Sequence, residues 1–106
     1  MDIQNKRALI TGGAQRVGKA IALALAQAGA EVIITYHSSA DQARATVAEI
    51  KQSGGRAAAY ACNQSEVASI EDLFSALRRD FDHLDMLINN AAIMERRPVL
   101  EVTLDD

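Results

Sequence analysis

Cysteine and long apolar segments are both scarce in this chain. Its 106 residues include one cysteine, Cys62, so an internal disulfide and a zinc site built from several cysteines are excluded. We expect Cys62 to be a small buried thiol at the end of a strand. No apolar run approaches the roughly 20 residues of a membrane-spanning helix, and no charged-then-apolar signal opens the sequence. We therefore expect a cytoplasmic protein with no membrane partner.

Positive charge is also limited. Lys and Arg number 11 against 14 Asp and Glu, which gives a formal net charge of −3, and no stripe of basic residues is present. This composition argues against duplex DNA or an anionic membrane as the main partner, so we expect no nucleic-acid ligand. Hydrophobic residues make up 49% of the chain, which is enough to bury a core. Residues 1–106 are interpreted as one domain or as part of a larger one.

Short apolar runs alternate with segments in which apolar residues recur at helical spacing. The pattern predicts strands at 7–10, 31–35, 56–61 and 84–88, and helices at 17–28, 41–52 and 66–79. Gly29 is expected to cap the first helix, whose inward face includes Val17, and the third helix is expected to turn Val67 inward. Strands separated by helices of this length imply right-handed crossovers and a parallel sheet covered on both faces. The predicted fold class is a three-layer α/β fold.

A glycine-rich turn follows the first predicted strand, in the segment KRALITGGAQRVGKA at 6–20. Glycines there leave room for a diphosphate near the backbone, and the following helix offers free N–H groups and the positive end of its dipole. A purely structural turn is one alternative. A phosphoryl-transfer loop is another, but Ala20 stands where the Mg²⁺-binding hydroxyl belongs. The fourth predicted strand also leads to Asn89 and not to a metal-binding aspartate, so no metal site is predicted.

Three motifs together carry a family resemblance. TGGAQRVG at 11–18, ACNQS at 61–65 and LINNAA at 87–92 resemble the short-chain dehydrogenase/reductase family, and the similarity covers essentially the whole chain. It implies the N-terminal half of a Rossmann-type, doubly wound parallel sheet with strand order 3-2-1-4. Arg16 stands where the family's middle glycine is usual, Ala92 replaces a final glycine, and Asn63 replaces a common aspartate. The arginine form of the turn is similar to that of pteridine-reductase-like members, which use NADPH.

The end of the second predicted strand bears on cofactor choice. NAD-specific sites place an acid about 20 residues after the glycine turn, where it bonds the ribose 2′-hydroxyl. Here Thr35 is followed by Tyr-His-Ser-Ser, and the first carboxylate is Asp41. Arg16 together with the His-Ser-Ser run at 37–39 could hold a 2′-phosphate, which favours NADP(H). The alternative is an ordinary solvated helix start with Ser39 as N-cap.

The other candidate contacts come from the two later motifs. The Asn63 amide could exchange hydrogen bonds with an adenine edge. Asn90 is assigned a cofactor role by the resemblance, whereas Asn89 is interpreted as bridging the backbones of neighbouring strands. The full set of candidate cofactor-binding residues is Gly12, Gln15, Arg16, Val17, His37, Ser38, Ser39, Asn63, Gln64, Asn90, Ala91 and Ala92.

Catalytic residues cannot be assigned in this chain. The resemblance implies a serine, a Tyr-x-x-x-Lys pair and a further asparagine beyond the NNAA motif, and neither Tyr36 nor Tyr60 is followed four positions later by lysine. We interpret the chain as the cofactor-binding part of an NADP(H)-dependent oxidoreductase that acts on a carbonyl or imine small-molecule substrate, pterin-like compounds included. A non-catalytic nucleotide-binding or sensing module is the alternative. His83 is expected on the surface, before the fourth strand.

Assembly is expected to involve the fourth predicted strand. In the order 3-2-1-4 this strand is normally central, and its MLI sequence is apolar at every position, as strands covered on both faces are. A chain that ends before a fifth strand would leave 85–89 as an open edge, which invites pairing. We therefore expect a homo-oligomer.

Overall fold

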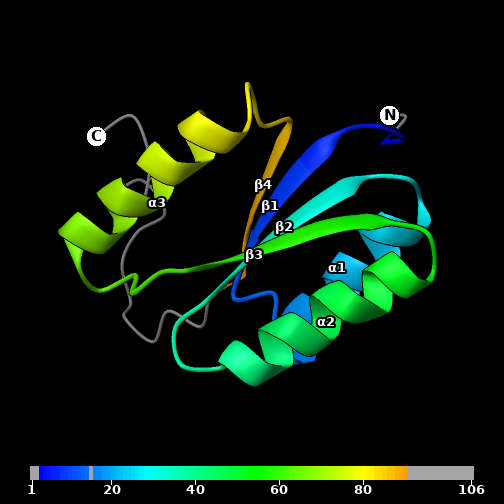
Figure 1. The fold of residues 1–106 in the computed structure, drawn as a ribbon, viewed down its shortest axis with the longest axis horizontal. Helices are drawn as coiled ribbons and strands as arrows, with labels where there is room; N and C mark the ends of the chain where they lie inside the picture. Colours follow the sequence, from blue (N-terminus) through cyan, green and yellow to red (C-terminus); the bar gives the residue numbers. More distant parts are fainter. Residues whose placement is uncertain (1–2, 15, 91–106) are drawn as a thin grey trace.

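The computed structural model describes residues 3–14 and 16–90, which form alternating strands and helices (Figure 1). The elements in chain order are β1 (Arg7–Thr11), α1 (Arg16–Gln27), β2 (Glu31–Tyr36), α2 (Ala40–Gln52), β3 (Arg56–Ala61), α3 (Val67–Asp80) and β4 (Met86–Asn89). All seven predicted elements are present, with ends that differ by one or two residues. Gly29 follows α1 as expected, and the backbone N–H groups of Gly29 and Ala30 bond back to the last turn of that helix.

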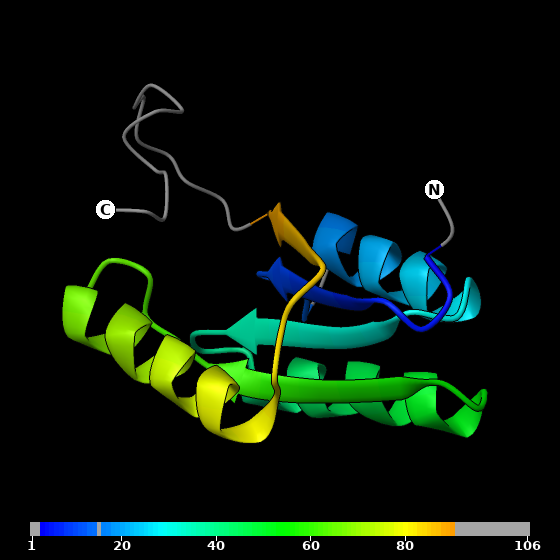
Figure 2. The ribbon, with the colours of Figure 1, turned by 90° about the horizontal axis from the view of Figure 1, so that it is seen from above.

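The four strands form one parallel sheet in the order β3-β2-β1-β4, as predicted. Leu9 in β1 pairs with Ile33 in β2 on one side and with Leu87 in β4 on the other. Because every strand runs in the same direction, the carboxyl ends of all four meet at one edge of the sheet (Figure 2). The three predicted motifs follow three of those ends.

Helices cover both faces of the sheet, which gives the expected three layers. Figures 1 and 2 show α1 and α2 on one face and α3 on the other. Alternate residues of β1 and β2 contribute to two separate cores, because successive side chains of a strand point to opposite faces of the sheet. The first core contains Ile10, Ala14, Ala22, Val32, Ile34, Ala43 and Ile50. The second contains Leu9, Ile33, Cys62, Leu73 and Leu77, so the prediction of a buried Cys62 thiol is confirmed.

Two valines that were expected to face the core are exposed. Val17 is 63% exposed and Val67 is 71% exposed. Each lies in the first turn of its helix, six residues after the last residue of the preceding strand. Neither side chain joins the cores that the following turns of these helices contribute to. The periodic pattern identified the helices correctly but placed the start of their buried stripe one turn too early.

β4 differs from a strand that is covered on both faces. Met86 and Ile88 are half-buried, whereas Leu87 is 43% exposed, although the sequence is apolar at all three positions. Within the described residues β4 pairs with β1 alone. Fewer neighbouring side chains therefore surround it than surround β1 or β2.

A charged cluster joins the amino ends of β1 and β4. The Arg7 guanidinium bonds Glu31 through Nε (2.8 Å) and Asp82 through Nη1 (3.0 Å). His83 lies between Asp82 (Nδ1 to Oδ1, 2.8 Å) and Asp85 (Nε2 to Oδ2, 3.2 Å), and its exposed side chain confirms the surface prediction. The Arg7 and His83 hydrogen bonds lower the pKa of Asp82, and the Arg7 backbone N–H lowers that of Asp85. This cluster lies at the end of the sheet opposite the glycine turn.

Candidate nucleotide-binding site

The turn between β1 and α1 depends on close backbone packing. Gly12 has a φ of 68°, a conformation that favours glycine. A Cβ atom added at Gly18 would overlap the Gly12 carbonyl oxygen and lie 2.5 Å from the Asn90 side-chain nitrogen. Only glycine therefore lets α1 begin this near to the turn. The first turn of α1 carries no acidic residue, so the positive end of its dipole is available to an anion.

Hydroxyl and amide groups fix this turn to the two strands that flank β1. The Gly12 N–H donates to Thr35 Oγ1 at the end of β2 (3.1 Å). The Thr11 hydroxyl accepts from the Asn90 N–H (2.9 Å) and donates to Asn89 Oδ1 (2.9 Å). Asn90 Nδ2 also reaches the Gly12 carbonyl oxygen (3.4 Å). The Asn89 side chain thus joins β4 to β1 through the Thr11 hydroxyl and not through a backbone group as predicted, and Asn90 also holds the turn.

Arg16 occupies an unusual backbone conformation at the mouth of the turn. Its φ is 59°, in the left-handed region, which costs a residue with a side chain about 1–2 kcal/mol. The side chain is exposed, and no hydrogen bond or ion pair joins it to another of residues 3–14 and 16–90. The turn therefore presents a cation that no other described residue engages, at a position where glycine would fit with less strain.

The segment after β2 presents side chains without carboxylates. His37 and Ser38 are exposed and Ser39 is half-buried. Ser39 stands at the N-cap position of α2, as the alternative interpretation of this run has it, but its hydroxyl makes no capping hydrogen bond. The first carboxylate, Asp41, pairs with Arg44 on the same helix (2.5 Å).

The end of β3 brings Asn63 to the same edge. The Cys62 N–H donates to the Tyr36 carbonyl oxygen (2.8 Å), which continues the pairing of β3 with β2 up to the motif. Asn63 Oδ1 accepts hydrogen bonds from the N–H (3.0 Å) and the hydroxyl (2.6 Å) of Ser65. The amide oxygen thus shapes a local turn, and the amide NH₂ is the group that could meet an adenine edge. Gln64 is half-buried beside it.

Comparison with known proteins identifies this arrangement. The family model described as short chain dehydrogenase matches residues 6–106. The chain belongs to this family. A short-chain dehydrogenase/reductase homolog of Bacillus subtilis, YusS, is 36% identical over 108 aligned positions, and the match covers 100% of this chain and 99% of that protein. The hydroxynaphthalene reductase-like protein Arp2 of Metarhizium robertsii is 38% identical over 98% of this chain, which spans 39% of the length of Arp2.

Experimental structures of short-chain dehydrogenases share the fold. One from Burkholderia cenocepacia, determined in complex with NADP, has a TM-score of 0.80 and 40% identity over 100% of this chain and 43% of its own. A dehydrogenase/reductase from Sinorhizobium meliloti has a TM-score of 0.81 and 38% identity over 99% of this chain and 42% of its own. The chain thus matches less than half of these structures.

The ion pair that Lys19 makes argues against a phosphoryl-transfer loop. The Lys19 ammonium lies 3.4 Å from a carboxylate oxygen of Glu49 in α2, whereas the lysine of a phosphoryl-transfer loop reaches the phosphates. In the described part of the chain, no group of three or more His, Cys, Asp or Glu side chains could hold a metal ion. None of the described helices has the length and apolar character needed to cross a bilayer.

One buried residue at the site was missed by the sequence analysis. Thr46 in α2 is 0% exposed, and its hydroxyl donates to the Ala14 carbonyl oxygen in the glycine turn (3.1 Å). A signal for it exists, because Thr46 is the polar member of an otherwise apolar stripe that includes Ala43, Val47 and Ile50. Of the other candidates, Gln15, Ala91 and Ala92 lie outside the described residues.

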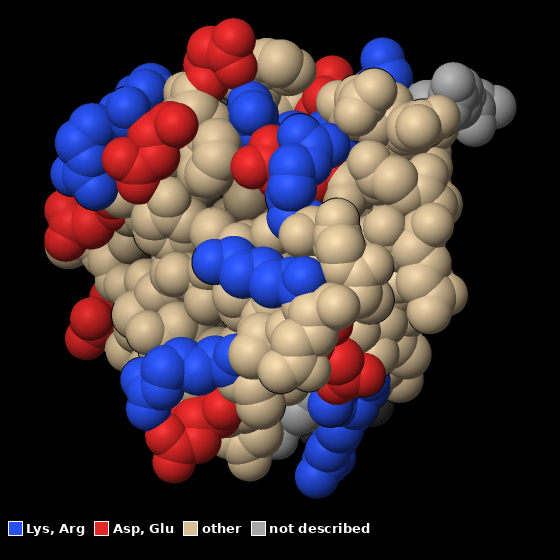
Figure 3. Space-filling view, turned by 45° about the vertical axis from the view of Figure 1, so that its right-hand side comes forward, with Lys and Arg blue, Asp and Glu red and all other residues tan. Residues whose placement is uncertain are grey.

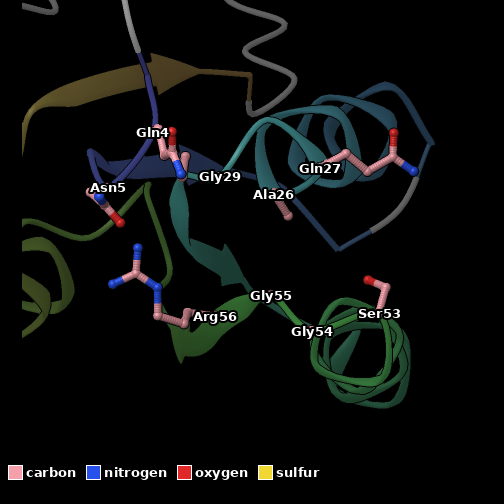
Figure 4. Close-up of a pocket in the computed structure, with 10 residues that line it drawn as sticks. Gln4, Asn5, Ala26, Gln27, Gly29, Ser53, Gly54, Gly55 and Arg56 are labelled. Atoms are coloured by element: carbon pink, nitrogen blue, oxygen red, sulfur yellow. The ribbon is translucent and has the colours of Figure 1, made fainter.

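A hollow of about 450 Å³ lies elsewhere, at the amino ends of the strands (Figure 4). It is lined by polar groups and glycines that include Gln4, Ser53, Gly54 and Arg56, from the loops that precede β1 and β3. None of the candidate cofactor residues lines it. On the face drawn in Figure 3, basic and acidic side chains are interspersed and no large area of one sign forms.

Proposed function

We propose that this chain is the cofactor-binding part of an NADP(H)-dependent short-chain oxidoreductase, which transfers a hydride between NADPH and a carbonyl or imine carbon. The observation that carries the proposal is the exposed guanidinium of Arg16, which pairs with no other described residue, combined with a β2 end that offers hydroxyls and no carboxylate before Asp41. A relative that is 40% identical was determined in complex with NADP, which supports the same cofactor here.

In this proposal, different groups at the carboxyl edge of the sheet contact different parts of the dinucleotide. The backbone at Gly12 and Gly18 admits the diphosphate to the amino end of α1, where N–H groups and the helix dipole favour an anion. The Arg16 guanidinium and the hydroxyls of Ser38 and Ser39 donate hydrogen bonds to the 2′-phosphate. The Asn63 amide meets the adenine edge. Bound NADPH supplies the hydride.

The nicotinamide side of the proposed site involves Asn90, Ala91 and Ala92. Asn90 is held by Thr11, so its backbone has a fixed position at the end of β4. The family resemblance implies that this backbone approaches a ribose, and that the small residues after it leave room for nicotinamide and substrate. Ala91 and Ala92 lie outside the described residues, so their part in the proposal rests on the sequence motif.

Neither tyrosine in the chain is suited to be the proton donor. Burial, followed by the hydrogen bond to Asp80 (2.6 Å), raises the pKa of Tyr60 to about 12. A catalytic acid needs a pKa near the working pH, and a phenol held this strongly protonated is a poor one. Tyr36 has Ala40 four positions later, where the family pattern requires lysine. The proton donor of the proposed reaction is therefore not a tyrosine of this chain.

A second candidate is a nucleotide-binding or sensing module without catalysis. The observation that favours it is the match to YusS, because 99% of that relative is covered by a chain without a Tyr-x-x-x-Lys pair. Both candidates require the dinucleotide site, and they differ in whether hydride transfer follows.

Calorimetric titration of the 106-residue chain with NADP⁺ and NAD⁺ tests the proposal. One charge-assisted hydrogen bond is worth about 1.5–3 kcal/mol, so NADP⁺ should bind at least about tenfold more tightly. Arg16→Glu should remove this preference. Arg79→Glu changes an exposed arginine at the far end of α3 and should not affect the preference. Equal or tighter binding of NAD⁺ by the wild-type chain would contradict the proposed cofactor.

A further inference from the structure

Two buried threonine hydroxyls attach both ends of one segment to the glycine turn. Thr35 ends the buried part of β2 and accepts the Gly12 N–H, and Thr46 in α2 donates to the Ala14 carbonyl oxygen. Between these two attachments the chain runs through the His-Ser-Ser segment at 37–39. The turn and this segment therefore form one closed loop of covalent and hydrogen bonds.

We propose that Thr46 is a positioning residue that sets the selectivity for a 2′-phosphate over a 2′-hydroxyl. It does so by fixing the distance between Arg16 on the turn and the serines that precede α2. This inference rests on the proposed function, because it assumes that both segments contact the same phosphate. Thr46 itself is 0% exposed and does not touch the nucleotide.

The hydrogen bond is placed to control that distance. Ala14 is 3% exposed and lies two positions before Arg16 in the sequence, so a shift of its carbonyl would move the backbone that leads to the arginine. Thr46 lies about two helical turns beyond Ser39. Because a hydrogen-bonded helix moves as a unit, fixing Thr46 also fixes the start of α2. A threonine within a helix commonly bonds a carbonyl one turn back, but this hydroxyl bonds another segment.

Other contacts between the turn and α2 are weaker or lie elsewhere. The Lys19–Glu49 ion pair also joins α1 to α2, but its side chains are 38% and 55% exposed, and exposed pairs contribute little. Gly13 packs against Ile34, so it attaches the turn to β2. Thr46 is thus the buried polar contact, among the described residues, that links the turn to the helix following the serines.

The experiment compares two probes that differ in the phosphate of interest, adenosine 2′,5′-bisphosphate and adenosine 5′-monophosphate. Their dissociation constants are measured for the wild-type chain, Thr46→Val, Thr46→Ser and Ile50→Val. Valine keeps the shape of threonine and removes the donor, whereas serine keeps the hydroxyl. Ile50→Val is the matched control, because Ile50 is buried on the same helix (1% exposed) and makes no contact of this kind with the turn.

Thr46→Val should lower the preference for the bisphosphate about threefold to tenfold, which is the range one ordinary hydrogen bond is worth. Binding of the monophosphate should change little. Thr46→Ser should restore most of the preference for the bisphosphate. Ile50→Val should lower the thermal midpoint of unfolding and leave that preference unchanged. If Thr46→Val does not fold, Thr46→Cys supplies a weak donor of similar size and should show a partial loss.

Two results separate the inference from the proposed function. A wild-type chain that binds both probes equally would overturn the proposed cofactor and the inference together. A wild-type preference that Thr46→Val leaves intact, or that Ile50→Val reduces as much, would overturn the inference alone. In that case Thr46 would be an ordinary structural residue of α2.

Discussion

Replacing Arg16 by glycine should move stability and cofactor affinity in opposite directions. The left-handed backbone at φ 59° costs arginine about 1–2 kcal/mol, and glycine avoids most of this cost. Glycine also gives the unfolded chain more freedom, which subtracts about 0.4–1 kcal/mol from the gain. The net expectation is a variant more stable by up to about 1 kcal/mol, or a few degrees in the unfolding midpoint of a chain of this size.

The same change removes the guanidinium from the proposed 2′-phosphate site. Loss of one charge-assisted hydrogen bond, about 1.5–3 kcal/mol, should weaken NADP⁺ at least about tenfold and leave NAD⁺ nearly unchanged. Arg16→Ala is the matched control, because it loses the same guanidinium but keeps a Cβ in the left-handed conformation. Alanine should therefore match glycine in affinity and fall below it in stability.

Urea unfolding and calorimetric titration of the three chains give the required numbers. An Arg16→Gly variant less stable than Arg16→Ala would contradict the cost assigned to the left-handed backbone. Arg16→Gly binding NADP⁺ as tightly as the wild-type chain would contradict the role of the guanidinium.

Three further predictions concern turnover, assembly and pH. The 106-residue chain should oxidise no NADPH with any carbonyl substrate, and protein-dependent oxidation abolished by a point change within residues 1–106 would refute this. If copies associate through the β4 edge, sedimentation at micromolar concentration should show a species heavier than a monomer, and Leu87→Lys, at a position 43% exposed, should shift it to monomer. An unchanged distribution would exclude this edge. Burial and the Asp80 hydrogen bond raise the pKa of Tyr60 from its ordinary value of 10.0 to about 12, so the stability linked to its proton is complete below pH 10 and is lost as pH rises toward 12. Tyr60→Phe should flatten the dependence of the urea midpoint on pH in that window, and an equally steep loss in the variant would contradict the assignment.

The helices, the strands and their parallel direction could be predicted because they depend on local signals, namely buried runs in β1 and β2, a glycine after α1 and the crossover rule. The position of β4 beside β1 was predicted from the family resemblance. The motif residues at the strand ends also follow from the parallel sheet, which brings their segments to one edge.

Other features could not be predicted because they depend on tertiary position. Val17 and Val67 fit the helical period, but in the folded chain both side chains are exposed, and the periodic pattern does not show which turn of a helix is covered. Ser39 is a suitable capping residue by type, yet its hydroxyl does not bond the helix N–H groups. The role of Thr46 depends on a contact with Ala14, which is far away in the sequence, and a polar residue in an apolar stripe only hints at such a contact.

The most direct test of the central claim maps NADP⁺ onto the chain by protein-observed NMR. Amide shifts should concentrate at the carboxyl edge of the sheet, at Gly12, Gly18, Ser38 and Ser39, and the shifts of the two serines should be smaller with NAD⁺. Shifts confined to the opposite end, around the hollow lined by Arg56, or identical shifts with the two dinucleotides, would contradict the claim.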